Sequence, residues 1–265
     1  MNILLPTGHR PLAWLLRSVA ALALILAMPA HATSPDKLAW VAGDLPPFIW
    51  QTKDGPQGLA YELMALMAAR IGRPVEVKFY PWARAVRMAQ EEGHYGVFPL
   101  ARTADREAQF KWLIPLAHVN YSFFGRAGNG RAQHQYQHDL HDLNALRASR
   151  VGVLRGSPII KNLQAENFQN LILAKDYKDL LRLLSEGIVA AAYAGEPMLR
   201  AAIADSTHRP QDFRVGASLK SAELYMASSL SLDQVEAERW LQAYRELQKE
   251  GAVSRLQQKY LLPRP

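Results

Sequence analysis

Apolar and polar positions follow two alternating patterns along the chain after residue 37. Short apolar runs are typical of buried strands, and longer segments with apolar residues every three or four positions are typical of amphipathic helices. This alternation predicts an α/β protein with mostly parallel strands and crossover helices. The expected strands are residues 38–42, 75–80, 95–100, 119–125, 150–154, 171–174, 188–194 and 224–227. The expected helices are residues 60–71, 82–92, 158–164, 177–186, 198–204, 231–250 and 253–260.

The pattern occurs twice, on either side of a polar stretch at residues 128–138. This predicts two lobes, each within the size range of an ordinary domain. Ligands prefer domain interfaces and the carboxyl ends of parallel strands, so we expect a binding site in the crevice between the lobes. Near the end of the chain, Ser231 is expected to cap a helix, with Gln234 reciprocating.

The first 32 residues have the features of a secretory signal peptide. Arg10 and Arg17 precede an apolar run at residues 19–28, which is too short to span a bilayer. Pro29 ends this run, and residues 30–32 give a small-x-small cleavage pattern. A membrane anchor is the alternative interpretation. We therefore expect a soluble, exported protein, and we place it in the periplasm.

Composition excludes several kinds of chemistry. The absence of cysteine removes cysteine nucleophiles, thiolate zinc sites, iron–sulfur clusters and disulfides.

The net charge does not indicate a nucleic-acid partner. The leader holds two arginines and no acid, so the net charge falls from +7 to +5 on cleavage. His134, His138 and His141 could share a helix face and bind zinc, but their polar surroundings favour a solvated loop. We expect no metal and no cofactor.

Four segments at predicted strand ends carry polar or aromatic groups. Arg106 has a planar guanidinium that can hold a carboxylate with two parallel bonds. Ser157 can cap a helix that starts at Pro158, where free N–H groups would face an anion. The segments are Gly-Asp-Leu-Pro-Pro-Phe at 43–48, Tyr-Pro-Trp-Ala-Arg at 80–84, Ala-Arg-Thr-Ala-Asp-Arg at 101–106 and Val-Gly-Val-Leu-Arg-Gly-Ser-Pro at 151–158.

In order and spacing, these segments resemble the extracytoplasmic solute-binding proteins of family 3, whose amino-acid branch serves ABC transporters. The resemblance covers nearly the whole mature chain. It implies a two-lobed periplasmic-binding-protein type II fold, with hinge crossovers near residues 117–122 and 225–230. Lobe 1 would comprise residues 33–120 and 228–265, and lobe 2 residues 121–227.

The resemblance also implies roles for individual residues. Arg106, with Thr103 in a Thr-x-x-Arg motif, would grip the solute carboxylate, and Trp82 would pack on the solute body. The other residues expected at the cleft are Asp44, Phe48, Arg155 and Ser157. Each also has a simpler interpretation, such as a core phenylalanine for Phe48 or a surface charge for an arginine.

One position departs from the family pattern. Gly195 stands where the family commonly has an aspartate that holds the solute's ammonium group. Glu196, one residue later, is the substitute that we consider. The chain therefore leaves open an anionic solute without an amine.

From these features we expect a periplasmic protein, a monomer and not an enzyme, that captures an amino acid or related organic anion. An ABC permease or a membrane receptor would be its partner. Two alternatives remain: a sensor module that presents solute to a receptor, and a lyase similar to cyclohexadienyl dehydratases. In the lyase, Glu196 or Asp44 would act as a general acid or base.

Overall fold

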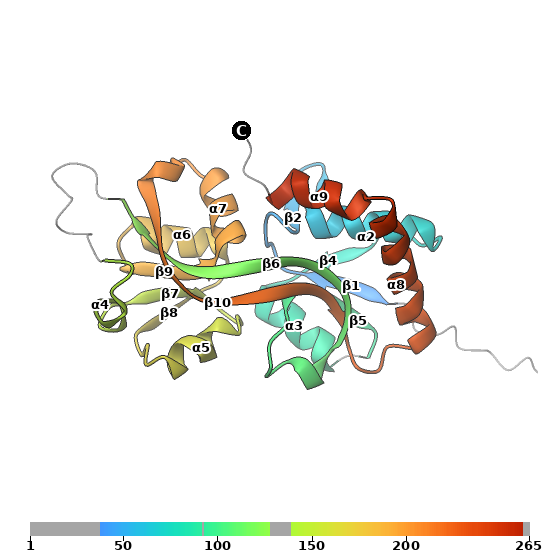
Figure 1. Cartoon of the computed structure of the whole chain (residues 1–265), viewed down its shortest axis with the longest axis horizontal. Helices are drawn as coiled ribbons and strands as arrows, with labels where there is room; N and C mark the ends of the chain where they lie inside the picture. Colours follow the sequence, from blue (N-terminus) through green and yellow to red (C-terminus); the bar gives the residue numbers. More distant parts are fainter. Residues whose placement is uncertain (1–37, 92, 128–138, 262–265) are drawn as a thin grey trace, which may run out of the picture. The chain divides into compact units, whose positions relative to one another are not determined.

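The computed structural model of the protein describes residues 38–91, 93–127 and 139–261 (Figure 1). The predicted signal peptide, His134 and His138 lie outside these residues. Asp36–Pro265 form one compact unit. Over the described ranges, no helix combines the length and the apolar character needed to cross a membrane.

An eight-stranded mixed sheet organises the described residues, in the order β4-β1-β5-β10-β6-β9-β7-β8. β1 pairs in parallel with β4 and β5, and β7 pairs in parallel with β8 and β9. The predicted α/β class is therefore confirmed. The strands are β1 (Ala39–Ala42), β4 (Val77–Phe79), β5 (Tyr95–Ala101), β6 (Lys111–Arg126), β7 (Val151–Leu154), β8 (Leu171–Ala174), β9 (Ala191–Gly195) and β10 (Phe213–Ser228).

Two long strands join the parallel groups. β6 and β10 have 16 residues each and pair with each other in antiparallel fashion. The last residues of β10 also pair with β5, and residues 121–124 of β6 pair with β9 (Figure 1). The division into two lobes, with its boundaries, stays a prediction.

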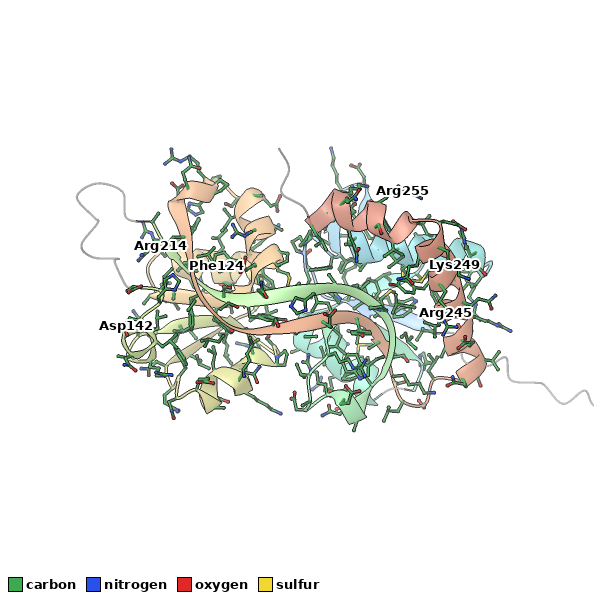
Figure 2. All side chains as sticks on the ribbon, viewed as in Figure 1. Phe124, Asp142, Arg214, Arg245, Lys249 and Arg255 are labelled. Atoms are coloured by element: carbon green, nitrogen blue, oxygen red, sulfur yellow. The ribbon has the colours of Figure 1, made fainter. Side chains whose placement is uncertain are left out.

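Helices cover this sheet, and most of them match the apolar periodicity. α8 buries Trp240, Tyr244 and Leu247 on one face and exposes charged residues such as Arg245 and Lys249 (Figure 2). α4 and the β2–β3 hairpin were not predicted, because both are too short to show a period. The remaining elements are β2 (Trp50–Thr52), β3 (Gly55–Gln57), α2 (Leu59–Arg70), α3 (Trp82–Glu91), α4 (Leu143–Arg147), α5 (Ile159–Ala165), α6 (Tyr177–Ser185), α7 (Glu196–Ala204), α8 (Gln234–Lys249) and α9 (Ala252–Leu261).

The start of α8 differs from the predicted one. Asp233 caps this helix, and its Oδ1 accepts hydrogen bonds from the N–H groups of Val235 at 2.9 Å and Glu236 at 3.1 Å. Ser231 instead donates its hydroxyl to the carbonyl of Gly93 at 2.9 Å. The prediction of Ser231 as the cap was wrong. An aspartate is as good a cap as serine, and its charge also interacts favourably with the helix dipole.

The start of α5 also differs. Pro158 occupies the N-cap position itself, and no side chain caps the helix. Ser157 is therefore not the cap, because the helix begins one residue later than predicted. Its backbone N–H donates to the carbonyl of Leu154 at 3.1 Å, which closes a tight turn after β7.

Candidate functional site

A small cavity lies where the carboxyl ends of parallel strands meet. Ala101 ends β5, Leu154 ends β7, and Tyr177 begins the helix that follows β8. The space open to the centre of a water molecule inside it is about 20 Å³, enough for one or two waters. Its lining residues are Leu45, Trp82, Pro99, Ala101, Arg106, Tyr121, Leu154, Ser157, Pro158, Tyr177, Met198 and Leu224.

The dominant charge of the cavity is the guanidinium of Arg106. This residue is only 7% exposed. Its Nη2 donates to the carbonyl of Gly156 at 3.1 Å, and its Nη1 lies 3.5 Å from the carbonyl of Ala101. Burial lowers the pKa of Arg106, while Asp105 and Tyr121 act in the opposite direction. An arginine nevertheless keeps its proton, so the cavity holds a permanent positive charge.

Among the described residues, no carboxylate forms an ion pair with Arg106, although the charge of Asp105 acts on it. The acid next to it in sequence, Asp105, accepts the hydroxyl of Thr103 at 2.6 Å and pairs with Lys161 at 3.3 Å. These two donors, together with the positive charge of Arg106, lower the pKa of Asp105. A buried cation without a counterion is costly unless something satisfies it. Arg106 is therefore suited to bind an anion.

Three residues that carry hydroxyl groups line the same space. They are Tyr121 on β6, Ser157 before α5 and Tyr177 at the start of α6. Burial raises the pKa of Tyr121 to about 12, against the lowering effect of Arg106. Burial also raises the pKa of Tyr177. Both phenols keep their protons near neutral pH, so all three groups can donate hydrogen bonds to an anion.

Trp82 gives the cavity an apolar wall. It opens α3, directly after the Tyr-Pro that follows β4, and is 7% exposed. Gly43 lets the indole lie close to the chain, because a methyl group there would be 3.2 Å from its Cε3. The structure thus brings Trp82, Arg106 and Ser157, three of the predicted site residues, to one cavity.

Asp44 and Phe48 do not line this cavity. Although Asp44 as a whole is exposed, partial burial of its carboxyl raises its pKa, and Lys178 acts in the opposite direction. Phe48 is fully buried in the hydrophobic core. Its place in the structure is the one that an apolar aromatic normally takes.

Thr103 and Arg155 also lie outside the lining. The Thr103 hydroxyl donates to Asp105 and not into the cavity. Arg155 exposes its side chain, and its backbone N–H donates to the carbonyl of Ala174 at 2.9 Å. Within the described ranges, no group of three or more histidine, aspartate or glutamate residues could hold a metal ion.

Glu196 points away from the cavity. Its Oε1 accepts the hydroxyl of Ser122 at 2.7 Å, and its Oε2 lies 3.5 Å from Nη2 of Arg200. Neighbouring side chains of a strand point to opposite faces. The bond to Ser122 therefore places the Glu196 carboxylate on the face of β6 opposite to Tyr121, which lines the cavity.

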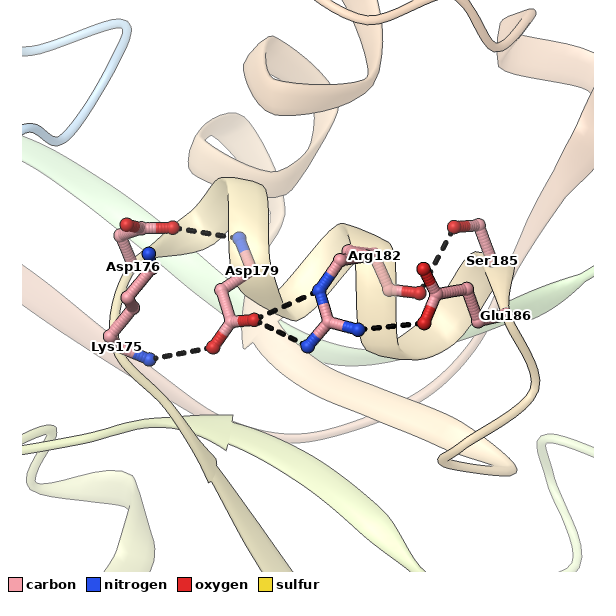
Figure 3. Close-up of polar contacts among 6 residues, drawn as sticks. All are labelled: Lys175, Asp176, Asp179, Arg182, Ser185 and Glu186. Carbon is pink, nitrogen blue, oxygen red and sulfur yellow. Dashed lines mark hydrogen bonds and ion pairs between the residues drawn. The ribbon is translucent and has the colours of Figure 1, made fainter.

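Sequence analysis missed Tyr121, Tyr177 and Met198. The signal for Tyr177 was its place directly after a predicted parallel strand. Its position is fixed by the start of α6, where Asp176 accepts the N–H of Asp179 at 2.7 Å (Figure 3). Asp179 in turn accepts the backbone N–H of Lys175 at 3.1 Å and is paired with Arg182 (Figure 3).

Gly156 brings the turn after β7 against α3. Its φ is +79°, and a methyl group there would lie 2.9 Å from the Cβ of Ala83. We expect Gly156→Ala to lose roughly 2–4 kcal/mol of the free energy of unfolding, from the left-handed backbone and from this overlap. Gly72→Ala is the control, because Gly72 has φ +67° and open space around it. Thermal melts compare the two variants, and equal losses would contradict the overlap.

Comparisons with known proteins agree with this architecture. The family model described as bacterial extracellular solute-binding proteins, family 3, matches residues 39–263. A search of curated proteins finds no match.

Solved structures share the fold. A histidine kinase sensor domain with similarity to periplasmic binding proteins has a TM-score of 0.73 at 21% identity, covering 86% of this chain and 97% of that chain. The GluR0 ligand-binding core from Nostoc punctiforme, in complex with (L)-glutamate, has a TM-score of 0.72 at 17% identity, and the match covers 85% of this chain and 100% of that chain. The substrate-binding protein of an amino acid ABC transporter has a TM-score of 0.69 at 14% identity, and the match covers 84% of this chain and 99% of that chain.

Since the family match spans most of the chain and the cavity lies at the strand ends of the same fold, this chain belongs to the bacterial extracellular solute-binding proteins of family 3, with a type II periplasmic-binding-protein fold.

Proposed function

We propose that this protein captures a small carboxylate-bearing solute, an amino acid or related organic anion, in the cavity around Arg106. The observation that carries the proposal is a guanidinium that is 7% exposed and, among the described residues, donates only to backbone carbonyls and forms no ion pair. A carboxylate would supply the missing counterion through two charge-assisted hydrogen bonds. Hydrogen bonds to charged groups contribute roughly 1.5–3 kcal/mol each.

The other lining groups complete this site. The hydroxyls of Tyr121, Ser157 and Tyr177 donate to the anion, and Trp82 packs against the solute body. Met198 contributes an adaptable apolar contact, because a thioether side chain fits irregular shapes.

Capture of a solute requires movement of the lining elements, because the present space holds only one or two waters. β6 and β10 are the elements that continue from one group of parallel strands to the other. A hinge in these strands would open the cavity, and closure would bury the solute. The hydrogen bond from Arg106 to the carbonyl of Gly156 would form again on closure.

The setting of this activity is the periplasm. The N-terminal leader predicts export, and the family description is that of extracellular proteins. An ABC permease is the partner that we propose, with the protein acting as a monomer. The likeness to a histidine kinase sensor domain favours a second candidate, in which the closed form signals to a membrane receptor. Membership of a binding-protein family favours binding over catalysis.

A thermal-shift screen of the full chain tests the proposal, with amino acids, 2-oxo acids, 2-hydroxy acids and polyamines. A carboxylate that binds, at a concentration of about 100 times its dissociation constant, should add roughly 2.7 kcal/mol to the free energy of unfolding. This raises the melting temperature by roughly 5–10 °C. The bound compound should be recovered unchanged. Stabilisation by polyamines alone would contradict the proposal, and conversion of the compound would favour an enzyme.

A further inference from the structure

The cavity contains hydrogen-bond donors and apolar groups but no acid. Its polar side chains are one guanidinium and three hydroxyls, and no aspartate or glutamate is among its lining residues. The remainder of the wall is aliphatic or aromatic, including Leu45, Leu154 and Leu224. The cavity can therefore satisfy a negative charge but offers no acidic side chain to a positive one.

Most of the carboxylates next to lining residues in sequence bind other partners: Asp176 accepts the N–H of Asp179, and Glu223 is paired with His118. Glu196 is held by Ser122 at 2.7 Å, on the face of β6 that Tyr121 does not occupy. Asp105 is held by Thr103 at 2.6 Å. Asp44 is exposed, and Lys178 acts on its charge. Movement of Glu196 or Asp105 toward an ammonium group would break these contacts, and Asp44 is not among the lining residues.

At the end of β9, the place of an added acid is taken by the flexible end of Met198. A side chain on Gly195 would begin 2.3 Å from Cε of Met198 and 3.5 Å from Cε1 of Tyr121. Met198 and Tyr121 both line the cavity. The thioether thus fills the place from which a carboxylate on β9 could reach the solute.

We infer that the preferred solute is an organic monocarboxylate without an amine, such as a 2-oxo or 2-hydroxy acid with an apolar side chain. The inference rests on the proposed function of the same cavity. A zwitterionic amino acid would bury its ammonium beside Arg106 and apolar walls, where no carboxylate compensates for the lost water. A 2-oxo or 2-hydroxy group instead finds donors in Tyr121, Ser157 and Tyr177.

Isothermal titration of the full chain with matched pairs tests this inference. The pairs share a carbon skeleton and differ at the second carbon: leucine against 2-hydroxy- and 2-oxo-4-methylpentanoate, and phenylalanine against 3-phenyllactate and phenylpyruvate. We expect the amine-free acid of at least one pair to bind at least about tenfold more tightly than its amino acid. An amino acid that binds as tightly as its partner would overturn the inference and leave the proposed function standing. Failure of every carboxylate to bind would overturn both.

A variant pair tests the physical reason. Met198→Glu adds the carboxylate that the cavity lacks, and Met198→Gln adds a neutral side chain of the same shape. Met198→Glu should bind the amine-free acid at least about tenfold more weakly than Met198→Gln does. Its preference for the amine-free acid over the amino acid should become smaller or reverse. Circular dichroism checks that both variants are folded. An unchanged preference in a folded Met198→Glu variant would overturn the inference.

Discussion

Arg106→Met is expected to abolish solute binding without unfolding the protein. Two charge-assisted hydrogen bonds to a carboxylate are together worth roughly 3–6 kcal/mol, so the affinity should fall at least about a hundredfold. The free energy of unfolding should change by no more than about 1 kcal/mol, because removal of the desolvation cost of the buried charge offsets the loss of its hydrogen bonds to the carbonyls of Gly156 and Ala101. Isothermal titration and thermal melts measure the two effects separately.

Matched variants separate this role of Arg106 from a general effect of positive charge. Arg102→Met removes a guanidinium four residues earlier, which is exposed and already paired with Glu107 at 2.5 Å. This control should bind the solute with unchanged affinity. Arg106→Lys keeps the charge but loses the planar fork, so its affinity should lie between those of the other two variants. An Arg106→Met variant that binds as well as the unaltered protein would remove Arg106 from the site.

The elements that the sequence predicts well are those with a buried face. The runs that became β1, β5, β7 and β8 are almost continuously apolar, and the helices that cover them show a clear period. Strand ends then indicated Trp82 and Arg106, because the carboxyl ends of parallel strands meet at one edge of a sheet. Local pattern and one topological rule were enough for both.

Other features depend on contacts between distant segments. The first half of β10 is partly exposed and polar, so residues 213–223 show no apolar run, and only pairing with β6 makes them a strand. Glu196 is next to the cavity in sequence, but the bond to Ser122, 74 residues away, directs it to the other face. Tyr121 lines the cavity because β6 is flanked by β10 and β9. No local signal carries this information.

Glu236 contacts a residue far away in the sequence, and of the substitutions considered, its loss should lower the stability most. Its side chain is 2% exposed on α8 and accepts hydrogen bonds from both terminal nitrogens of Arg73, which follows α2. Trp240 donates its indole N–H to the same carboxylate at 2.9 Å. Glu236→Gln keeps the shape but leaves a largely buried guanidinium without its partner. Such a loss costs roughly 3–5 kcal/mol, and the melting temperature should fall by roughly 10 °C or more.

Two comparisons show whether burial causes this effect. Glu186→Gln breaks an exposed pair with Arg182 on α6, at 2.6 Å, and should cost less than about 1 kcal/mol. The double variant Arg73→Met with Glu236→Met should recover much of the loss, because neither charge then remains buried alone. Solute affinity should be unchanged throughout, since neither Arg73 nor Glu236 lines the cavity. If Glu236→Gln melts at the same temperature as Glu186→Gln, the ion pair does not hold α8 to the end of α2.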